Sequence, residues 1–182
     1  LEVDCVMYAT GRKPKTDDIG LENTKVECNA SGAIIVNDDY QTSEPSIYGL
    51  GDATDRVQLT PVALAEGMAL VRKLYGNANQ KVDYNFIATA VFSNPNIGTV
   101  GYSEEDAVAK YEKIAVYKAE FKHMKHTLGG SDEKTFMKLL VDQKTDKVIG
   151  CHMVGSDAGE IIQGIAIAIK AGATKNDFDT TI

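Results

Sequence analysis

The sequence has 182 residues, of which 43% are hydrophobic and 25% charged, and its 19 basic and 26 acidic side chains give a net charge of −7. A chain of this length buries roughly 70% of its unfolded surface when it folds, which suffices for one domain or two small ones. The negative charge argues against nucleic acid or an anionic membrane as a partner, since no positive field attracts phosphates. No apolar run approaches the ~20 residues that span a bilayer, so we expect a soluble protein.

Both ends of the sequence look interrupted. Residues Val3–Tyr8 form an apolar run of strand character with no initiator methionine before it. At the other end, Asn176 is a candidate N-cap with acidic residues following in the first turn of a helix. We therefore expect a segment of a longer polypeptide.

The first half of the chain alternates short apolar runs with turns and then enters a helix. Strands are predicted at residues 34–36 and 47–50. Thr60 is a suitable N-cap, and Pro61 suits the first helical position, where its missing N–H is not needed. The polar residues 75–80 predict a connection, and we expect the domain boundary just after it.

The second half is typical of hairpin-linked strands with flanking helices. One helix is expected to begin after Ser103, with Asp106 three residues on, and a longer one covers Asp157–Ala171 and ends at Gly172. This order predicts an α+β fold with a mostly antiparallel sheet. The expected strands cover residues 86–92, 97–102, 114–121, 135–141 and 147–154.

The cysteines and histidines favour neither a disulfide scaffold nor a metal site. Cys5, Cys28 and Cys151 are an odd number with no close pair, so a reducing cytoplasm is the expected location. Cys151 and His152 are neighbours in a predicted strand and point to opposite faces. His123 and His126 could meet on one helical turn, but no third ligand lies nearby in the sequence.

Residues 47–60 contain the first feature that points to a function. Asp52 ends a glycine-containing apolar strand, where a carboxylate can accept hydrogen bonds from sugar-like hydroxyls. The helix beginning near Thr60 offers free N–H groups and a positive dipole end that favours an anion. Together they would suit a polyol joined to a ring that becomes anionic, as in reduced flavin. An aspartate in an ordinary turn, followed by an ordinary capped helix, would show the same sequence pattern without binding a ligand, because Gly-Asp dipeptides are common.

The second feature is the helix Asp157–Ala171, which is apolar around nearly its whole circumference. Such a helix is expected to be buried on all sides. Each isoleucine left in water would forgo roughly 1.5–3 kcal/mol of burial. Either other helices of the same domain cover its outer face, or the chain associates with a second copy.

Three stretches in correct order, Ala9–Pro14, Tyr48–Asp52 and Leu59–Ala63, resemble the flavin-dependent pyridine nucleotide–disulfide oxidoreductases. Within that family, residues 121–137 are most similar to glutathione reductases of the plant-like and bacterial type. Further stretches that resemble the glutathione reductases are residues 91–95, 97–101, 138–141, 147–150 and 162–166. The resemblance covers essentially the whole chain.

The resemblance implies two domains. Residues 1–84 would be the carboxyl-side portion of a Rossmann-like α/β FAD-binding domain, with the tail of the NADPH domain at its start. Residues 85–182 would be an α+β dimerisation domain, truncated at its C-terminus, through which the parent protein forms a homodimer.

The resemblance also implies roles for individual residues. Asp52 would hydrogen-bond the flavin ribityl chain, and the N–H of Thr60 would reach the flavin pyrimidine carbonyl. Gly11, Gln58 and Ala90 would lie beside the NADPH path.

On the substrate side, the resemblance gives Met68 and Met124 as candidates for contact with glutathione disulfide. Met68 departs from the animal and enteric forms, which carry an arginine there, so recognition of a carboxylate at this point must differ. No cysteine matches the family's redox pair, so we expect no catalytic residue in this segment and no reductase activity from it alone. Alternatives are a dimerisation module only, or part of a related enzyme such as dihydrolipoamide dehydrogenase or mercuric reductase.

Overall fold

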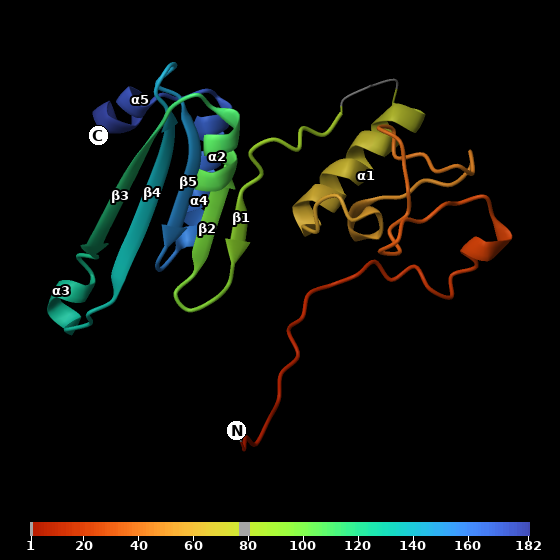
Figure 1. Cartoon of the computed structure of the whole chain (residues 1–182), viewed down its shortest axis with the longest axis horizontal. Coiled ribbons are helices and arrows are strands. Elements are labelled where there is room, and N and C mark those ends of the chain that lie inside the picture. Colours follow the sequence, from red (N-terminus) through yellow and green to blue (C-terminus); the bar gives the residue numbers. More distant parts are fainter. Residues whose placement is uncertain (1, 77–80) are drawn as a thin grey trace. The chain divides into compact units, whose positions relative to one another are not determined.

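The computed structural model describes residues 2–76 and 81–182, which belong to two compact units, Leu1–Asp83 and Tyr84–Ile182 (Figure 1). The helical elements of the first unit are η1 (Leu21–Asn23), η2 (Gly51–Thr54) and α1 (Thr60–Tyr75). Its core is formed by α1 and the loops that pack on it. The residues of this core are Tyr40, Ala69 and Leu70, with Tyr48, Leu50 and Val82 packed against them.

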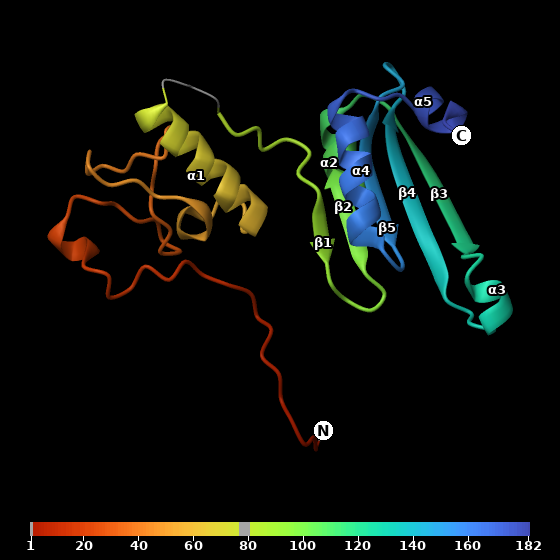
Figure 2. The ribbon, with the colours of Figure 1, turned by 180° about the vertical axis from the view of Figure 1, so that it is seen from behind.

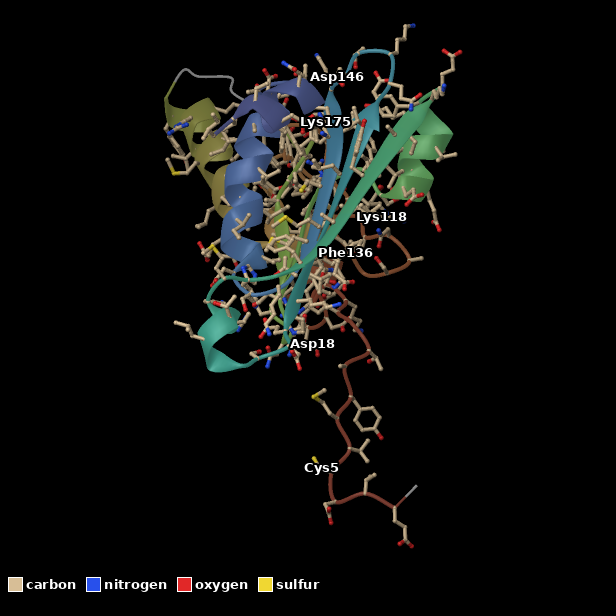
Figure 3. All side chains as sticks on the ribbon, turned by 90° about the vertical axis from the view of Figure 1, so that its left-hand side faces the viewer. Cys5, Asp18, Lys118, Phe136, Asp146 and Lys175 are labelled. Atoms are coloured by element: carbon tan, nitrogen blue, oxygen red, sulfur yellow. The ribbon has the colours of Figure 1, made fainter. Side chains whose placement is uncertain are left out.

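The strands predicted in the first unit are wrong in extent. Residues 34–36 and 47–50 make only isolated bridges, Cys28 with Ile34 and Gln41 with Tyr48. Residues Val3–Tyr8 form no strand and are exposed, and Figure 3 shows Cys5 on this extended segment. The physical reason is that a strand persists only where a neighbouring strand takes up successive N–H and C=O groups, and here the described residues provide at most single bridges.

Helix α1 begins one residue earlier than predicted. Leu59 is the N-cap with φ −133°, and Thr60 is already helical, so Thr60 is not the cap. Pro61 lies in the first turn, as expected. Tyr75 still belongs to the helix, and the N–H of Gly76 donates to the carbonyl of Arg72 at 2.8 Å. Residues 77–80 of the predicted connection lie outside the described residues.

The second unit is a five-stranded antiparallel sheet with helices on both faces, which confirms the predicted α+β class. The strand order is β1-β2-β5-β4-β3. The predicted strand at residues 86–92 shrinks to β1, because Phe86 has φ +55°, which no strand contains. The strands are β1 (Thr89–Val91), β2 (Ile97–Gly101), β3 (Ile114–Lys122), β4 (Lys134–Asp142) and β5 (Val148–Val154).

Helix α4 (Ala158–Lys170) packs mainly on β1, β2 and β5, and most of β3 and β4 extends beyond it on this face (Figure 2). Its contacts with the sheet form the main core, which contains Val100, Val141, Val148, Cys151, Ile162, Ala166 and Ile169. The other face carries α2 (Glu104–Lys110), whose Ala107 packs on Leu140 and Ile149. Ser103 caps α2 as predicted, with its Oγ accepting from the N–H of Asp106 at 3.1 Å.

Two short helices complete the second unit, α3 (His126–Gly129) and α5 (Lys175–Thr180). The cap of α5 is Thr174 rather than the predicted Asn176. Thr174 Oγ1 accepts from the N–H of Asp177, whose carboxylate accepts from the N–H of Thr174 in return. This reciprocal box satisfies two helix-end donors, which Asn176 alone would not do. Asp146 and Lys175 meet at this end of the unit, where the N–H of Lys175 donates to the Asp146 carbonyl at 2.8 Å (Figure 3).

Among the described residues, none of the helices has the length and apolar character needed to cross a membrane.

Candidate cofactor-binding site

The turn η2 presents the carboxylate of Asp52 to solvent. Asp52 is the second residue of the turn, and its side chain is 51% exposed. The turn is closed by Thr54, whose hydroxyl donates to the carbonyl of Gly51 at 2.9 Å. Gly51 itself has φ +57°, a conformation that a residue with a side chain rarely adopts. A rigid turn therefore carries an accessible acid.

The same turn lies directly against α1. The N–H of Gly51 donates to Glu66 Oε2 at 2.6 Å, and Glu66 is buried in the helix. A Cβ atom at Gly51 would lie only 2.8 Å from the Cβ of Ala63, so only glycine allows this approach. Ala63 lies one helical turn after Thr60. The two residues that the sequence analysis paired, Asp52 and Thr60, thus come from elements in contact.

The start of α1 has a backbone donor that the helix does not use. The first helical hydrogen bonds run from the N–H groups of Val62 and Ala63 to the carbonyl of Leu59, at 3.0 and 3.1 Å. The N–H of Thr60 precedes them, and Thr60 is exposed. An anionic or carbonyl oxygen placed here would meet a free donor and the positive end of a 16-residue helix.

Sequence reasoning gave no role to Arg12, which the structure brings to Asp52. Its Nη1 lies 3.7 Å from Asp52 Oδ2, with both side chains largely exposed. Such an exposed pair contributes little to stability. The neighbouring Gly11 has open space where a side chain would stand. The only sequence signal for this contact was the run of residues 9–14 itself, because forty residues separate the two partners.

Two other predicted residues of the first unit lie near these elements. Gln58, between η2 and α1, donates from Nε2 to Asp55 Oδ1 at 2.6 Å. Met68 lies on the outer face of α1 and is 51% exposed. It belongs to an exposed apolar stripe at helical spacing, together with Leu64, Val71 and Tyr75.

Ala90 and Met124 belong to the second unit. Ala90 is in β1 and pairs with Gly98. It also packs against Gly159 of α4, because a Cβ atom added at Gly159 would lie 3.1 Å from the Cβ of Ala90. Met124 lies between β3 and α3 and is 89% exposed.

Of the two histidine side chains near Met124, His123 makes a hydrogen bond, whereas Nε2 of His126 is buried without a hydrogen-bond partner among the described residues. His123 Nε2 is hydrogen-bonded to Thr135 Oγ1, and its ring stacks edge-on against that of His126 with centroids 5.9 Å apart. Glu133 Oε2 lies 3.9 Å from His126 Nε2. Its other carboxylate oxygen, Oε1, accepts a hydrogen bond of 2.7 Å from the Ser156 hydroxyl, and this bond lowers the pKa of the Glu133 carboxyl. In the part of the chain that the structure describes, no three His, Cys, Asp or Glu side chains are grouped to hold a metal ion.

Cys151 and His152 point to opposite faces of β5, as predicted. Cys151 lies in the core under α4, and burial raises the pKa of its thiol to about 11. His152 donates from Nε2 to the Tyr102 carbonyl at 3.0 Å, and in this neutral tautomer its Nδ1 accepts from the Thr99 hydroxyl at 2.6 Å. Burial lowers the pKa of His152, so its neutral form is favoured.

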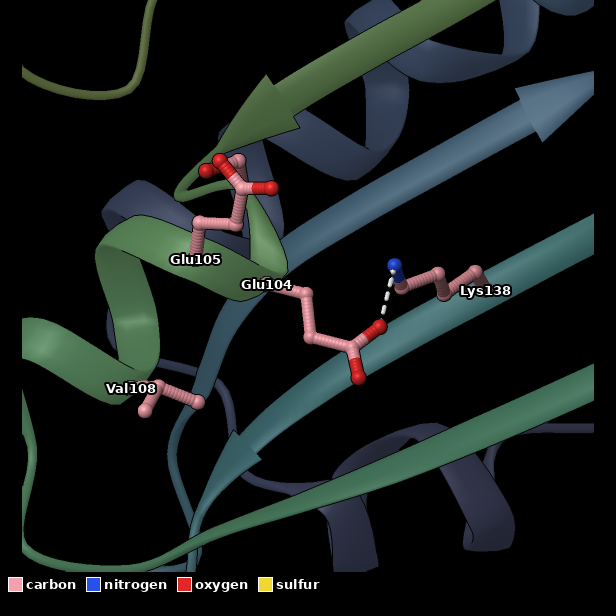
Figure 4. A pocket seen from close by; sticks show the side chains of 5 residues that line it. Glu104, Glu105, Val108 and Lys138 are labelled. Atoms are coloured by element: carbon pink, nitrogen blue, oxygen red, sulfur yellow. Dashed lines mark ion pairs between the residues drawn. The ribbon is translucent and has the colours of Figure 1, made fainter.

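A shallow hollow on the α2 side of the sheet is lined by two glutamates and one lysine, which leaves it one negative charge. Glu104 Oε2 pairs with Lys138 Nζ at 2.7 Å across it, and the hydrogen bond from Lys138 lowers the pKa of Glu104 (Figure 4). Ser103, Glu105 and Val108 complete the lining. This hollow contains none of the predicted cofactor residues.

The outer face of α4 is exposed within its unit, so among the described residues no other helix of the same domain covers it. Ile162 is 1% exposed against the sheet, but Ile161 and Ile167 are 39% and 67% exposed. On β3, the edge strand of the same sheet, Tyr117 and Phe121 are also exposed, at 46% and 41%. Within this unit one side of the helix is covered and the other is not.

Comparison with known proteins defines the class. Residues 87–182 match the family model of the pyridine nucleotide-disulphide oxidoreductase dimerisation domain, and residues 1–67 match that of the pyridine nucleotide-disulphide oxidoreductases. The first match alone covers more than half of the chain. The chain therefore belongs to the pyridine nucleotide–disulphide oxidoreductase family, and the resemblance seen in its sequence is confirmed.

Within this family, the chain is similar to individual disulfide reductases. The chain is 52% identical to the chloroplastic/mitochondrial glutathione reductase of Pisum sativum over 97% of its own length, and 48% identical to the glutathione reductase of a Nostoc species over 98%. The chain is also 42% identical, over 100% of its own length, to the trypanothione reductase of Trypanosoma congolense. It spans only 32%, 42% and 37% of these proteins, respectively.

A solved structure supports the same class. The HOCl-induced flavoprotein disulfide reductase RclA from Escherichia coli superposes on 96% of the chain with a TM-score of 0.86 and 26% identity. The match covers 40% of that protein.

Proposed function

We propose that the chain is the carboxyl-side part of an FAD- and NADPH-dependent glutathione-disulfide reductase. The observation that carries this proposal is the contact between the turn with Asp52 and the first turns of α1, beside relatives that are glutathione reductases. Membership of the family implies a flavin and a nicotinamide nucleotide for the whole protein. NADPH as the reductant and glutathione disulfide as the substrate follow from the relatives only. Residues 1–84 would then belong to the FAD-binding domain and residues 85–182 to the dimerisation domain.

The residues at η2 and α1 fit a flavin. The exposed Asp52 carboxylate can accept hydrogen bonds from ribityl hydroxyls, and the free N–H of Thr60 can donate to a carbonyl of the flavin ring. The positive end of α1 would also stabilise negative charge on that ring. When bound, the flavin supplies the electron transfer from the nicotinamide to a disulfide. This chain's contribution is to hold and orient it.

The other candidate residues follow from the resemblance. Gly11, Gln58 and Ala90 would lie on the NADPH side, and Met68 and Met124 on the substrate side. The exposure of both methionines leaves them accessible to a ligand within their own units. A thioether cannot pair with a carboxylate, so Met68 would contribute apolar contact rather than charge.

The second proposed property is homodimerisation through the second unit. Exposed apolar side chains lie on two elements of this unit, Ile161 and Ile167 on α4 and Tyr117 and Phe121 on β3, and we take them together as its apolar surface. Burying an isoleucine of this kind is worth roughly 1.5–3 kcal/mol, so the surface favours association. The match of residues 87–182 to a dimerisation domain supports a second copy of the chain as the partner. A pure dimerisation module is the remaining alternative, and it would bind no flavin.

A reducing compartment such as the cytoplasm is the proposed location, because Cys5, Cys28 and Cys151 are all free thiols.

The experiment is an NADPH-oxidation assay on the full-length protein that contains this sequence. Glutathione disulfide is compared with trypanothione disulfide and lipoamide as substrates, and the 182-residue chain alone serves as the control. We expect turnover with glutathione disulfide in the full-length protein and none in the control, which has no cysteine pair to receive electrons. A preference for lipoamide, or turnover by the control, would contradict the proposal.

A further inference from the structure

Glu66 is a glutamate in the middle of α1, and only 1% of its surface is exposed. Burying a carboxylate is unfavourable unless hydrogen bonds compensate for the lost water. Its Oε2 accepts a hydrogen bond of 2.6 Å from the backbone N–H of Gly51. The bond connects the interior of the helix to the residue immediately before Asp52.

The turn η2 is fixed at further points besides Glu66. The carbonyl of Ala53 accepts from the N–H of Ile34 at 2.9 Å, and the hydroxyl of Thr54 donates to the carbonyl of Gly51. These bonds hold the centre and the end of the turn. The bond from Gly51 to Glu66 holds its beginning against α1.

We propose that Glu66 is a positioning residue for flavin binding: it holds the beginning of η2 so that Asp52 presents its carboxylate to the ribityl hydroxyls. This inference rests on the proposed function of Asp52. Glu66 does not touch the cofactor, because its side chain is enclosed in the unit. Its effect passes through one backbone N–H to the next residue, and so it depends on Asp52 being present.

The test is a double-mutant cycle in the full-length protein. Glu66→Ala, Glu66→Gln and Asp52→Ala are made singly, and each Glu66 variant is also combined with Asp52→Ala. The dissociation constant of FAD is measured by fluorescence titration of the apoprotein. Leu70→Ala, which removes another buried side chain of α1, is the control for general loosening of the unit. Glu66→Asp, too short to reach Gly51, replaces Glu66→Ala if the alanine variant does not fold.

Glu66→Ala is expected to weaken FAD binding about tenfold, the effect of one lost hydrogen bond to a charged group. Glu66→Gln keeps a carbonyl acceptor for Gly51 and should stay within about twofold of wild type. With Asp52 already replaced, Glu66→Ala should add less than about twofold, because coupled residues are not additive.

Equal effects of Glu66→Ala in both backgrounds, or an equal loss in Leu70→Ala, would overturn the positioning role while leaving the role of Asp52 intact. If Asp52→Ala alone leaves FAD affinity unchanged, the flavin contact itself is wrong, and the inference falls with it.

Discussion

Gly98 of β2 lies directly beneath Ala158 at the start of α4: a Cβ atom on Gly98 would be 2.5 Å from the carbonyl oxygen of Ala158. It would also be 3.0 Å from the Cβ of Ile162, a core residue. The absence of a side chain therefore sets how closely the helix approaches the sheet.

We expect Gly98→Ala to destabilise the second unit by about 1–3 kcal/mol, because overpacking must push α4 away from β2. Urea unfolding followed by circular dichroism measures this change. Gly129→Ala is the matched control, since nothing lies within 4 Å of its added Cβ, and it should leave stability nearly unchanged. Equal stability of the two variants would show that the helix is not held at this distance.

Cys151 should resist alkylation in the folded protein. Burial raises the pKa of its thiol to about 11, so only about one molecule in a thousand carries the thiolate near pH 8. Peptide mapping after brief treatment with N-ethylmaleimide should find Cys5 and Cys28 labelled, because both are exposed, and Cys151 labelled only after unfolding. Labelling of Cys151 at the rate of Cys28 would contradict its place in the core.

His152 should make the second unit less stable as the pH falls. Burial lowers the pKa of His152, so the unfolded chain takes up the proton first and stability falls as the pH drops below the ordinary histidine value of about 6.5. Above that pH the histidine is neutral in both states, and the full stability of the unit is retained. His152→Gln should reduce the loss of unfolding free energy between about pH 7 and about pH 5. Parallel pH profiles for the two proteins would refute this account of the imidazole.

Ile167→Lys should break the proposed homodimer. Ile167 is 67% exposed on the outer face of α4, and a charge there cannot be buried against a second copy without a partner. Sedimentation velocity over a range of concentrations should show a dimer for the wild type and a monomer for this variant. Val108→Lys, at a residue 64% exposed on α2 across the sheet, is the control and should remain dimeric. A dimer that survives Ile167→Lys would exclude this face.

The second unit could be predicted largely from the sequence because its structure depends on local signals. The strands β4 and β5 form on either side of the predicted polar turn, and α4 ends at Lys170, shortly before Gly172. The first unit was less predictable. Residues Val3–Tyr8 and 47–50 have strand character, but strand formation also needs a neighbour, which no local pattern reveals.

The site shows the same limit. Asp52 and Thr60 are close in sequence, but only the family resemblance separated a flavin site from an ordinary turn aspartate beside a capped helix. Arg12 could not be connected with Asp52, because the contact depends on the path of the chain between them. A glutamate within a helix is usually solvated, so the sequence gives no sign that Glu66 is buried. Only the fold reveals that it lies against Gly51.

The central claim is that Asp52 holds the ribityl chain of a flavin, and an FAD titration of the full-length apoprotein tests it most directly. Loss of a hydrogen bond to a charged group should make Asp52→Ala bind FAD about ten- to a hundredfold more weakly than wild type. Asp38→Ala, which removes an exposed carboxylate elsewhere in the same unit, should bind FAD as the wild type does. Equal FAD affinity in all three proteins would contradict the assignment of this turn as a flavin site.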